Sequence, residues 1–436
     1  MSRAPSTGYR DTWLWNLGFS AYWFATSYKW YILLIIVIPG QVVDLITADA
    51  VRGGMALETA QQYAEDFKNT KWGLVVLLGA VWALFGPMIF GGWSDRLRSR
   101  FGHRQPFIAA GAALTVVSLA VLADARSYWV LIVGYLLLQF SDDVGTGPYS
   151  AMVPEIVPEE SRGRASSVMS MLQLVGQIAS AVAALALGDF KLIYLGVGVV
   201  NLLCAGWTIW TIRAVRPAPA EEETKKELFF RKWARPFKQR DFVWVWFTRL
   251  LSALGFFLVT QYILNFLTDA YTSYVFFGVD LGTAKQAVNV LGLTMSLTGA
   301  FGAMYAARHS DRIGRKPLIY VSGVLIFCVM VPFALVRDYT AAWCLAAVFG
   351  AGYGLYISAD WALVSDVIPN KRSAGVEMGV WASSIVSVQL LSGAYGSVID
   401  WLNKKSPHAG YMSAVALAGC LFLVSTVLVR QVRGSR

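Results

Sequence analysis

The chain has 436 residues, of which 56% are hydrophobic and only 15% are charged. A soluble globular domain carries roughly 25% charged residues, so this composition excludes an ordinary soluble protein. The net charge of +10 does not indicate a nucleic-acid partner, because Lys and Arg lie between apolar runs rather than in one patch. The cysteines all lie inside apolar runs without CxxC spacing, which argues against a disulfide framework or a metal site. They are Cys204, Cys328, Cys344 and Cys420.

Twelve apolar runs are long enough to cross a membrane as helices, which takes ~20 residues each. We predict spans at 14–45, 72–94, 105–124, 128–152, 164–188, 191–212, 242–268, 286–307, 317–336, 341–364, 374–398 and 410–430. The first run holds Pro39-Gly40, so we expect a kink or a frayed outer end there. It is too long for a cleavable signal peptide, and we expect none.

The distribution of Lys and Arg predicts the orientation of these spans. Of 37 such residues, 26 lie at the termini and in the loops on the same side, and 9 lie in the opposite loops. We therefore expect a multi-pass protein of the cell (inner) membrane with both termini in the cytoplasm. Residues 213–240 form a polar segment that separates six spans (1–212) from six (241–436). We interpret it as a cytoplasmic linker with a short amphipathic helix around Leu228 to Trp233.

Two motifs recur in the two halves of the chain. GGWSDRLRSRFGHRQPF (91–107) and AARHSDRIGRKPL (306–318) each join two apolar runs and share Ser-Asp-Arg, then Gly, basic residues and Pro. Their aspartates, Asp95 and Asp311, lie 216 residues apart. A second repeat follows spans four and ten, where three positions match at an offset of 211. The matching pairs are Val153 and Val364, Glu155 and Asp366, and Pro158 and Pro369.

The paired Ser-Asp-Arg motifs resemble the loop between the second and third helices of each half in the major facilitator superfamily of transporters. This resemblance implies an all-α membrane protein with twelve transmembrane helices in two pseudo-symmetric six-helix bundles. It also implies a substrate site near mid-membrane between the halves and transport by alternating access.

The N-terminal half also resembles a narrower group, the sucrose carriers and the glycoside–pentoside–hexuronide cation symporters. SDRLRSRFGHRQPFI carries the extra residues of the sucrose-carrier loop, Gly147-Pro148 with Ala151 resembles the end of their fourth span, and Trp30 and Pro39 fit their first. The chain departs from the sucrose carriers at Gln139, where they have an acid, and around Thr260 and Tyr262, where they have acids in span seven.

Two adjacent acids, Asp142 and Asp143, lie midway along span four. A carboxylate in the bilayer core costs ~2.5–3.5 kcal/mol, so it persists where a cavity, a partner or a proton lowers that cost. Adjacent helical residues point ~100° apart, so one acid should face the cavity while the other packs towards another helix. We interpret the pair as the proton-coupling site; the alternative is a buried structural pair with Arg or Lys.

Lys29 and Arg249 are the only basic residues inside predicted spans rather than at their ends. Lys29 is expected to pair with an acid of span four, to bind substrate or to tie neighbouring helices, and Arg249 to snorkel or to pair. Polar groups of span seven, Tyr262 included, suit sugar hydroxyls, and aromatic faces suit a pyranose. The candidate substrate-binding residues are Lys29, Trp30, Gln139, Arg249, Gln261, Asn265, Asp360 and Trp361.

The two basic loops are interpreted as gates. In the superfamily that the chain resembles, Asp95 and Asp311 approach helix N-termini of the opposite half, where helix dipoles stabilise carboxylates. Basic residues of the loops are expected to pair with Glu155 and Asp366 and to hold the cytoplasmic side shut. The alternative is positive-inside topology alone. The candidate gating residues are Asp95, Arg96, Arg100, Arg104, Glu155, Asp311, Arg312, Arg315 and Asp366, with Lys316 beside them.

No enzyme constellation is found: three histidines lie in loops or at span ends, and there is no ATP-binding Gly-x-x-x-x-Gly-Lys motif. We therefore expect a monomeric secondary transporter without catalytic residues, cofactor or metal, in contact with membrane lipid. The leading hypothesis is symport of a proton with a sugar or glycoside, with sodium as an alternative ion. Two other hypotheses are a proton-driven exporter of drugs, organic anions or amphipathic solutes, and a non-transporting receptor or assembly factor.

Overall fold

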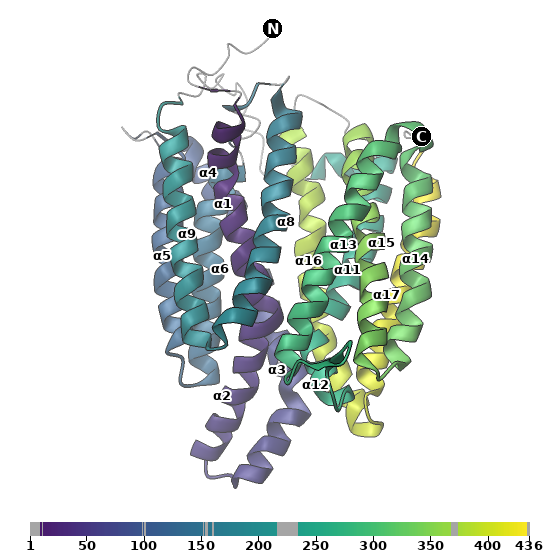
Figure 1. Ribbon diagram of the computed structural model, residues 1–436. Coiled ribbons are helices and arrows are strands. Elements are labelled where there is room, and N and C mark those ends of the chain that lie inside the picture. Colours follow the sequence, from purple (N-terminus) through teal and green to yellow (C-terminus); the bar gives the residue numbers. More distant parts are fainter. Residues whose placement is uncertain are drawn as a thin grey trace. The chain divides into compact units, whose positions relative to one another are not determined.

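The structure is a computed structural model, and it describes residues 9–10, 12–97, 99, 102–150, 152, 156–158, 161–215, 234–367 and 374–433. These residues are almost entirely helical (Figure 1). Each predicted span coincides with one helix or with two or three consecutive helical segments. Among the described residues, nine helical segments are long and apolar enough to cross a membrane by length and composition.

The chain forms two compact units, and they do not follow the sequence halves throughout. The first unit contains residues 1–33 and 78–226, and the second contains 34–77 and 227–436. The second unit therefore takes in the end of the first predicted span and the start of the second. The division into bundles at 1–212 and 241–436, with a linker at 213–240, stays a prediction. The expected amphipathic helix at 228–233 lies outside the described residues.

Six principal helices make up the described part of the first unit. They are α1 (Trp13–Ile32), α4 (Gly86–Arg96), α5 (Gln105–Ala123), α6 (Tyr128–Ser150), α8 (Arg162–Leu187) and α9 (Phe190–Ile212). Helix α1 packs on α8 and α9, α6 packs on α4 and α5, and α5 packs on α9. Small residues allow close approach: the backbone of Phe24 on α1 passes so near Gly176 on α8 that an added Cβ would lie 2.6 Å from the Phe24 carbonyl oxygen.

The second unit begins with a helical hairpin and continues with the second half of the chain. The hairpin follows the π-helical turn η1 (Leu33–Val37) and consists of α2 (Ile38–Arg52) and α3 (Leu57–Ala83), whose last six residues belong to the first unit. The remaining elements are η3 (Pro236–Lys238), α11 (Arg240–Thr260), α12 (Ile263–Ala270), β1 (Val275–Phe276), β2 (Val279–Asp280), α13 (Ala284–Ile313), α14 (Arg315–Leu335), α15 (Tyr339–Val367), α16 (Ala374–Lys405), α17 (Ala409–Leu428) and η5 (Val429–Gln431).

Helix pairing repeats between the two units. In the first, spans one and five (α1 and α8), one and six (α1 and α9), two and four (α4 and α6), three and four (α5 and α6), and three and six (α5 and α9) are in contact. The corresponding pairs in the second are α11 and α16, α11 and α17, α13 and α15, α14 and α15, and α14 and α17. The duplication read from the loop motifs thus extends to the packing within each unit.

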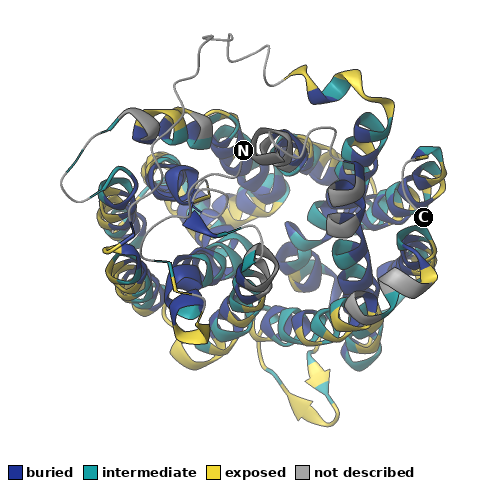
Figure 2. Ribbon diagram, turned by 90° about the horizontal axis from the view of Figure 1, so that it is seen from above, coloured by how far each residue is buried: buried dark blue, intermediate teal, exposed yellow. Residues whose placement is uncertain are grey.

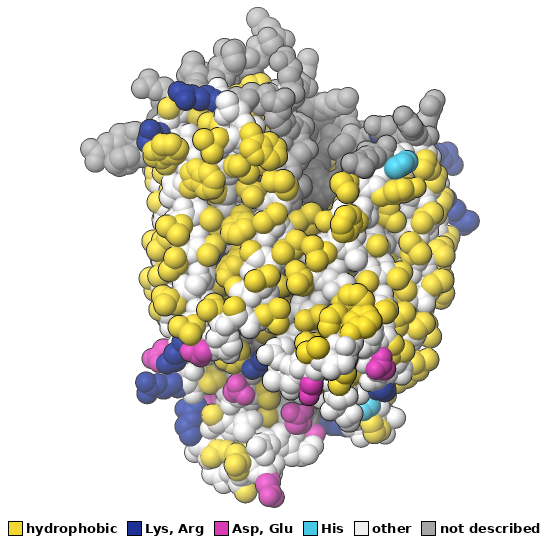
Figure 3. Space-filling model, viewed as in Figure 1, with side chains coloured by type: hydrophobic (Ala, Val, Ile, Leu, Met, Phe, Trp, Pro, Cys, Tyr) yellow, Lys and Arg dark blue, Asp and Glu magenta, His cyan; other side chains and the backbone are white. Residues whose placement is uncertain are grey.

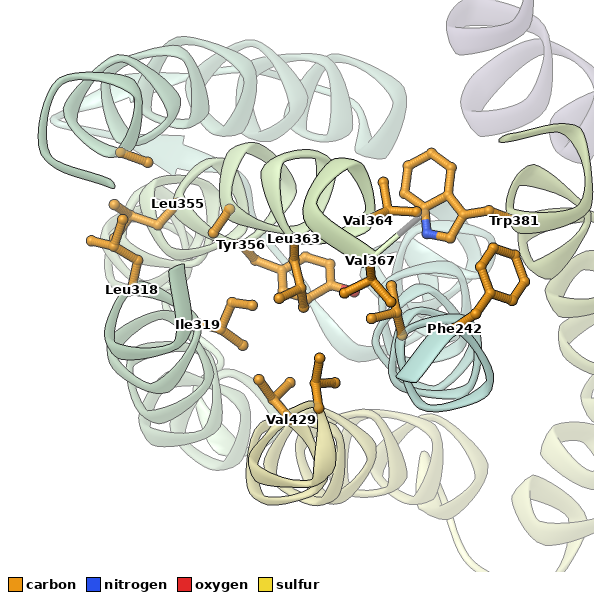
Figure 4. Close-up of a cluster of buried hydrophobic side chains, with 14 of the residues drawn as sticks. Phe242, Leu318, Ile319, Leu355, Tyr356, Leu363, Val364, Val367, Trp381 and Val429 are labelled. Carbon is orange, nitrogen blue, oxygen red and sulfur yellow. The ribbon is translucent and has the colours of Figure 1, made fainter. Parts of the chain in front are cut away.

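Buried and exposed side chains lie on opposite sides of most helices (Figure 2). The buried core of the second unit includes side chains of α11, α14, α15, α16 and η5 (Figure 4): Phe242, Leu318, Ile319, Leu355, Leu363, Val364, Val367, Trp381 and Val429. Many large apolar side chains are exposed instead, including Trp129, Leu203 and Val324. On the face seen in Figure 3, hydrophobic side chains cover the helices while charged ones gather near their ends. This pattern suits helices surrounded by lipid.

Between the first two predicted spans, the helices extend well beyond the apolar runs. Residues 47–71, predicted as a loop, form the end of α2 and the first half of α3, joined by a tight turn at Gly53-Gly54 (Figure 1). The segment is rich in Ala, Gln and Glu, which favour helices, and Gln62 donates a hydrogen bond of 2.8 Å to Asp66 one turn on. Helical propensity therefore prolongs the spans past their apolar part.

Candidate functional site

The first buried charge pair joins α1 to α6 within the first unit. Lys29 Nζ donates to Asp142 Oδ1, and the lysine side chain is fully buried. Trp30 Nε1 donates to the other carboxylate oxygen, Asp142 Oδ2, over 3.0 Å. Both oxygens of Asp142 thus have a donor from α1, which compensates the loss of water around the charge.

Asp143, the next residue, turns to a different neighbour. Its Oδ1 accepts a hydrogen bond of 3.3 Å from Gln139, one turn earlier on α6. Its Oδ2 is buried and has no hydrogen-bond partner. The carboxyl group lies against Gly86, where α4 begins, because a Cβ built on that glycine would lie 2.8 Å from Asp143 Cγ. A buried carboxyl with one oxygen free of donors is suited to holding a proton.

The second unit contains a comparable pair between α11 and α15. Arg249 Nη1 donates to Asp360 Oδ2, and both side chains are buried. The guanidinium carbon lies 3.5 Å from the ring centroid of Trp381 on α16, a cation–π contact. The side chain of Trp361, the neighbour of Asp360, lies outside the described part of the chain.

These two ion pairs occupy corresponding places in the repeat. Each links the first span of its half to the fourth, over 113 residues for Lys29 and Asp142 and 111 for Arg249 and Asp360. The sequence singled out all four residues individually but did not reveal their correspondence. The pairs differ in chemistry, since Arg cannot be deprotonated in proteins and Lys presents a single compact ammonium.

Gln261 and Asn265, predicted to bind substrate, lie at a break in span seven and make internal hydrogen bonds. Helix α11 ends at Thr260 and α12 begins at Ile263. Gln261 Nε2 donates to Tyr262 Oη over 3.1 Å, and its Oε1 accepts from Ser392 over 2.8 Å. Asn265 Nδ2 donates to Asn69 Oδ1 over 2.8 Å. Both amides are thus tied into the packing of the second unit.

A polar network that sequence reasoning missed surrounds Asn69 on α3. We call it the hairpin cluster, and it consists of Lys68, Asn69, Thr70, Asp269, Asp400 and Tyr411. Asn69 Nδ2 donates to Asp400 Oδ1 over 2.8 Å and to Tyr411 Oη over 3.0 Å. Thr70 donates to Asp400 Oδ2 from its backbone nitrogen over 2.7 Å and from its hydroxyl over 2.6 Å.

The remaining contacts of the hairpin cluster form an ion pair and a backbone crossing. Lys68 pairs with Asp269, whose other oxygen accepts from Tyr411 over 2.6 Å. Helix α3 also crosses α16 closely, since a Cβ on Gly396 would lie 2.8 Å from the backbone carbon of Asn69. The sequence offered one clue to this close crossing. Two glycines, Gly393 and Gly396, lie near the end of predicted span eleven, shortly before Asp400.

One glycine in each repeated loop motif has the same unusual backbone dihedral. Gly102 and Gly314 both have positive φ, 94° and 96°, which favours glycine because it has no Cβ. In the first loop Arg104 donates to Ser94 Oγ and, over 3.2 Å, to Gly91 O, both on α4. Asp95 and Arg96 form the last turn of α4, and Arg315 begins α14.

Several predicted gate contacts lie outside the described residues. These are the positions of Arg100 and Glu155 and the side chains of Asp95, Arg96, Asp311, Arg312 and Asp366. Their roles stay predictions. Among the residues that the structure does describe, no three His, Cys, Asp or Glu side chains gather as a metal ion would require.

The long apolar helices, the pairing that repeats from unit to unit and the matching buried ion pairs define a multi-pass integral membrane transporter of duplicated six-helix design. The chain belongs to the Major Facilitator Superfamily, whose sequence profile matches residues 54–393. The predicted fold class is thereby confirmed. The narrower resemblance to sucrose and glycoside carriers stays a prediction.

Among characterised relatives, the chain is similar to Multidrug resistance protein MdtH of several bacteria. It is 26% identical to that of Yersinia enterocolitica over 174 residues, which is 39% of this chain and 40% of the relative. It is 24% identical to that of Escherichia coli K12 over 270 residues, 61% of either protein. The chain thus matches less than two thirds of the length of these relatives.

Solved structures of similar fold cover nearly the whole chain. A D-xylose-proton symporter superimposes with a TM-score of 0.68 at 14% identity, over 97% of this chain and 99% of the other. The nucleoside transporter NupG gives 0.65 at 12% identity, over 96% and 98%. A bacterial homolog of the human lysosomal transporter Spinster gives 0.65 at 14% identity, over 95% and 94%. At such identities the likeness is one of fold.

Proposed function

We propose that this transporter is a symporter that couples uptake of a sugar or glycoside, of di- or oligosaccharide size, to a proton by alternating access. The observation that carries the proposal is the triad of Lys29, Asp142 and Asp143 in the first unit. One acid is fully hydrogen-bonded to α1, while the other keeps an oxygen without a donor in a buried place. A group that carries a transported proton must be able to accept that proton and release it. A buried carboxyl group with one oxygen free of donors is suited to this.

The two acids take different roles in this proposal. Asp142 holds Lys29 in place, because its two oxygens are already occupied by the ammonium and by the indole of Trp30. Asp143 receives the proton on Oδ2 and releases it on the other side of the membrane. Gln139 supports this by donating to Oδ1, so the proton is directed to the second oxygen.

The choice of a sugar as substrate has two supports. The sequence of the first and fourth spans and of the loop after the second span resembles sugar carriers, and a D-xylose-proton symporter shares the fold. Within the first unit, Trp30 presents an aromatic face next to the ion pair and contacts Tyr135 edge-on at 6.1 Å between ring centroids. Such faces can stack on the apolar side of a pyranose.

We further propose that the protein resides in the inner membrane as a monomer with both termini in the cytoplasm, as the distribution of Lys and Arg predicts. The segment 213–240 then forms a cytoplasmic linker. The candidate gating residues, including Asp95 and Asp311, then lie on the cytoplasmic side.

The decisive experiment is uptake into proteoliposomes with an imposed pH gradient, using labelled mono-, di- and oligosaccharides and an uncoupler. We expect accumulation of at least one sugar above its external concentration, and collapse of that accumulation on adding the uncoupler. A sodium gradient in place of the pH gradient identifies sodium coupling. Absence of flux for every sugar under both gradients would overturn the proposal.

The second candidate is a proton-driven exporter of drugs or other amphipathic solutes. The observation that favours it is the similarity to Multidrug resistance protein MdtH at 24–26% identity. In cells that express the transporter, an exporter lowers the retention of a fluorescent dye, and an uncoupler restores it. The sugar symporter leaves dye retention unchanged. A chain that moves neither sugar nor dye is instead a receptor or assembly factor.

A further inference from the structure

The second span of the first half is interrupted next to the proposed proton site. Helix α3 ends at Ala83, and α4 begins at Gly86 after a turn at Leu84 and Phe85. Pro87 stands in the first turn of α4. Proline has no N–H, so it cannot continue the hydrogen-bond ladder of α3, and this explains why the span breaks here.

Asp143 lies directly on this break. A Cβ on Gly86 would lie 2.8 Å from Cγ and 2.9 Å from Cβ of Asp143, so the acid occupies the space that any larger residue would need. Asp143 is only 2% exposed, and its Oδ2, which has no hydrogen-bond partner, is the nearest of its atoms to that position. The first turn of a helix carries partial positive charge, so it attracts an ionised carboxylate more than a protonated one.

The other end of α4 carries the repeated loop motif. Its last turn contains Asp95 and Arg96, and Arg104 from the start of α5 binds Ser94 Oγ and Gly91 O on the same helix. Eleven helical residues span about 16 Å without interruption, so a displacement of one end is expected to reach the other. A shift of the first turn of α4 is therefore carried to the motif loop.

Helices α4 and α6 pack closely, so the contact between Asp143 and Gly86 depends on the position of the first turn of α4. A Cβ on Gly147 of α6 would lie 2.9 Å from Pro87 Cα, so the two backbones touch at the same turn.

The titratable groups around Asp143 are few: Lys29 on α1, and Asp142 and Tyr135 on α6 itself. The described residues of α5 and of the end of α3 (78–83) include no Asp, Glu, Lys, Arg or His, and α4 has charges only in its last turn.

We propose that α4 transmits the protonation state of Asp143 to the motif loop, with Gly86 as the positioning residue that lets the carboxyl group reach the helix N-terminus. The ionised carboxylate holds the first turn of α4, and protonation from the transported proton releases it. The inference rests on the proposed proton coupling, and it adds the route by which that proton changes the loop with Asp95.

The test follows the motif loop directly and needs no substrate. A single reporter, Ser99→Cys, is introduced in the loop after α4, in a background in which the four native cysteines are replaced by serine (Cys204, Cys328, Cys344 and Cys420). The measurement is the rate of labelling by a maleimide in detergent between pH 5.5 and 8.5, corrected with a free-thiol standard. We expect the corrected rate to change at least threefold with pH. Asp143→Asn should abolish the change.

The variants of the break distinguish this route from a general effect of pH. Gly86→Ala forces Asp143 away, and Pro87→Ala restores an N–H to the break. In each variant, the change of the corrected labelling rate between pH 5.5 and 8.5 should be at least threefold smaller than in the parent protein. The matched control is Gly92→Ala on the same helix, because a Cβ there meets nothing within 4 Å. It should label like the parent protein. Size-exclusion profiles identify variants that fail to fold, and Pro87→Ala carries the test if Gly86→Ala fails.

Two results have distinct meanings. If Gly86→Ala and Pro87→Ala both fold and retain the parental pH dependence, the route through α4 is overturned. If labelling responds as expected but sugar uptake never depends on a pH gradient, the proposed symport fails while the link between Asp143 and the motif loop stands.

Discussion

Asp142 and Asp143 are neighbours in the chain, but their carboxyl groups meet different helices. Successive residues of a helix point ~100° apart, so Asp142 reaches Lys29 on α1 while Asp143 reaches the break before α4. In the proposed mechanism, identical chemistry at adjacent positions is thus divided between holding a buried cation and holding a proton. The same substitution at the two positions should have different consequences.

Asp143→Asn should leave the fold intact and abolish uphill accumulation, because asparagine mimics the protonated acid in size but cannot release a proton. Exchange of labelled for unlabelled sugar across proteoliposomes should persist.

Asp142→Asn should instead destabilise the protein by about 3–5 kcal/mol, since Lys29 is left buried without its counter-charge. Thermal unfolding in detergent measures this difference. Coupled, pH-dependent accumulation by both variants and by the double variant would place the proton elsewhere, with Asp360 next in line.

Arg249 and Asp360 allow the matching test in the second unit. Asp360→Asn should lower stability by about 3–5 kcal/mol because the guanidinium loses its buried partner. The double variant Arg249→Gln with Asp360→Asn removes both charges and should recover much of that loss. The measurement is the unfolding temperature of both variants and the parent. Equal loss in the single and double variants would mean that the charge of Arg249 is compensated by other groups.

Among the helical elements, two interruptions of spans have polar side chains beside them. The break between α3 and α4 faces Asp143, and the break between α11 and α12 provides Gln261 and Asn265 to the packing around α3. Helix ends expose backbone groups that need partners, which side chains supply. The hairpin cluster lies within continuous helices instead, and both oxygens of Asp400 accept hydrogen bonds there.

Asp400→Ala should destabilise the protein by at least ~3 kcal/mol, because it removes hydrogen bonds from Asn69 and Thr70 to a charged, buried group. The control is Asp66→Ala in the same hairpin. Asp66 lies 3.6 Å from Lys404 in an exposed pair, whose loss should change stability by ~1 kcal/mol or less. Similar unfolding temperatures for the two variants would show that the hairpin cluster contributes little to stability.

The sequence was sufficient for the spans but not for these interruptions. Apolar runs of ~20 residues locate helices reliably in a membrane, because no other element of a single chain satisfies its backbone there. Pro87 was visible within span two, but proline in a membrane helix breaks it only in some surroundings. Asn69 and Asp400 lay in segments predicted as loops, where polar residues are ordinarily solvated. Their pairing depends on tertiary contact between residues 331 positions apart.

The candidate site was predictable in its residues but not in its partners. Lys29, Arg249, Asp142 and Asp360 are conspicuous because charges inside apolar runs are rare. Which acid each cation selects depends on the rotation of its helix, and the sequence leaves that rotation open. Gln261 and Asn265 make internal hydrogen bonds that the sequence did not reveal, and their expected substrate contacts stay a prediction.

At the scale of the whole molecule, duplication is the organising feature. Five helix pairings, the buried ion pairs and the positive φ of Gly102 and Gly314 recur in both halves. A repeated positive-φ glycine with a repeated acid in the same motif favours a shared mechanical role for the two loops. That role is tested by treating the two motif aspartates alike.

Asp95→Ala and Asp311→Ala should each bias the transporter towards an inward-open state. Transport should fall more than substrate affinity, because the substrate-binding residues are unchanged while the equilibrium between the inward-open and outward-open states is shifted. Labelling of cysteines introduced on the cytoplasmic side should become faster. Asp241→Ala, in the first turn of α11 and outside both motifs, serves as the comparison. Unchanged labelling and transport in both motif variants would reduce the aspartates to ordinary loop residues.

The hairpin cluster also has a consequence for biosynthesis. Asn69 is translated 331 residues before Asp400, which amounts to about 15–70 s at ~5–20 residues per second. Asn265 and Asp269, the partners of Asn69 and Lys68, are translated 196 and 201 residues after them, so the hairpin cluster gains these contacts first and the contacts to Asp400 and Tyr411 last. The second unit is completed only when α16 and α17 emerge. Nascent chains arrested before residue 400 should therefore keep the hairpin open to protease, and release of the full-length chain should close it.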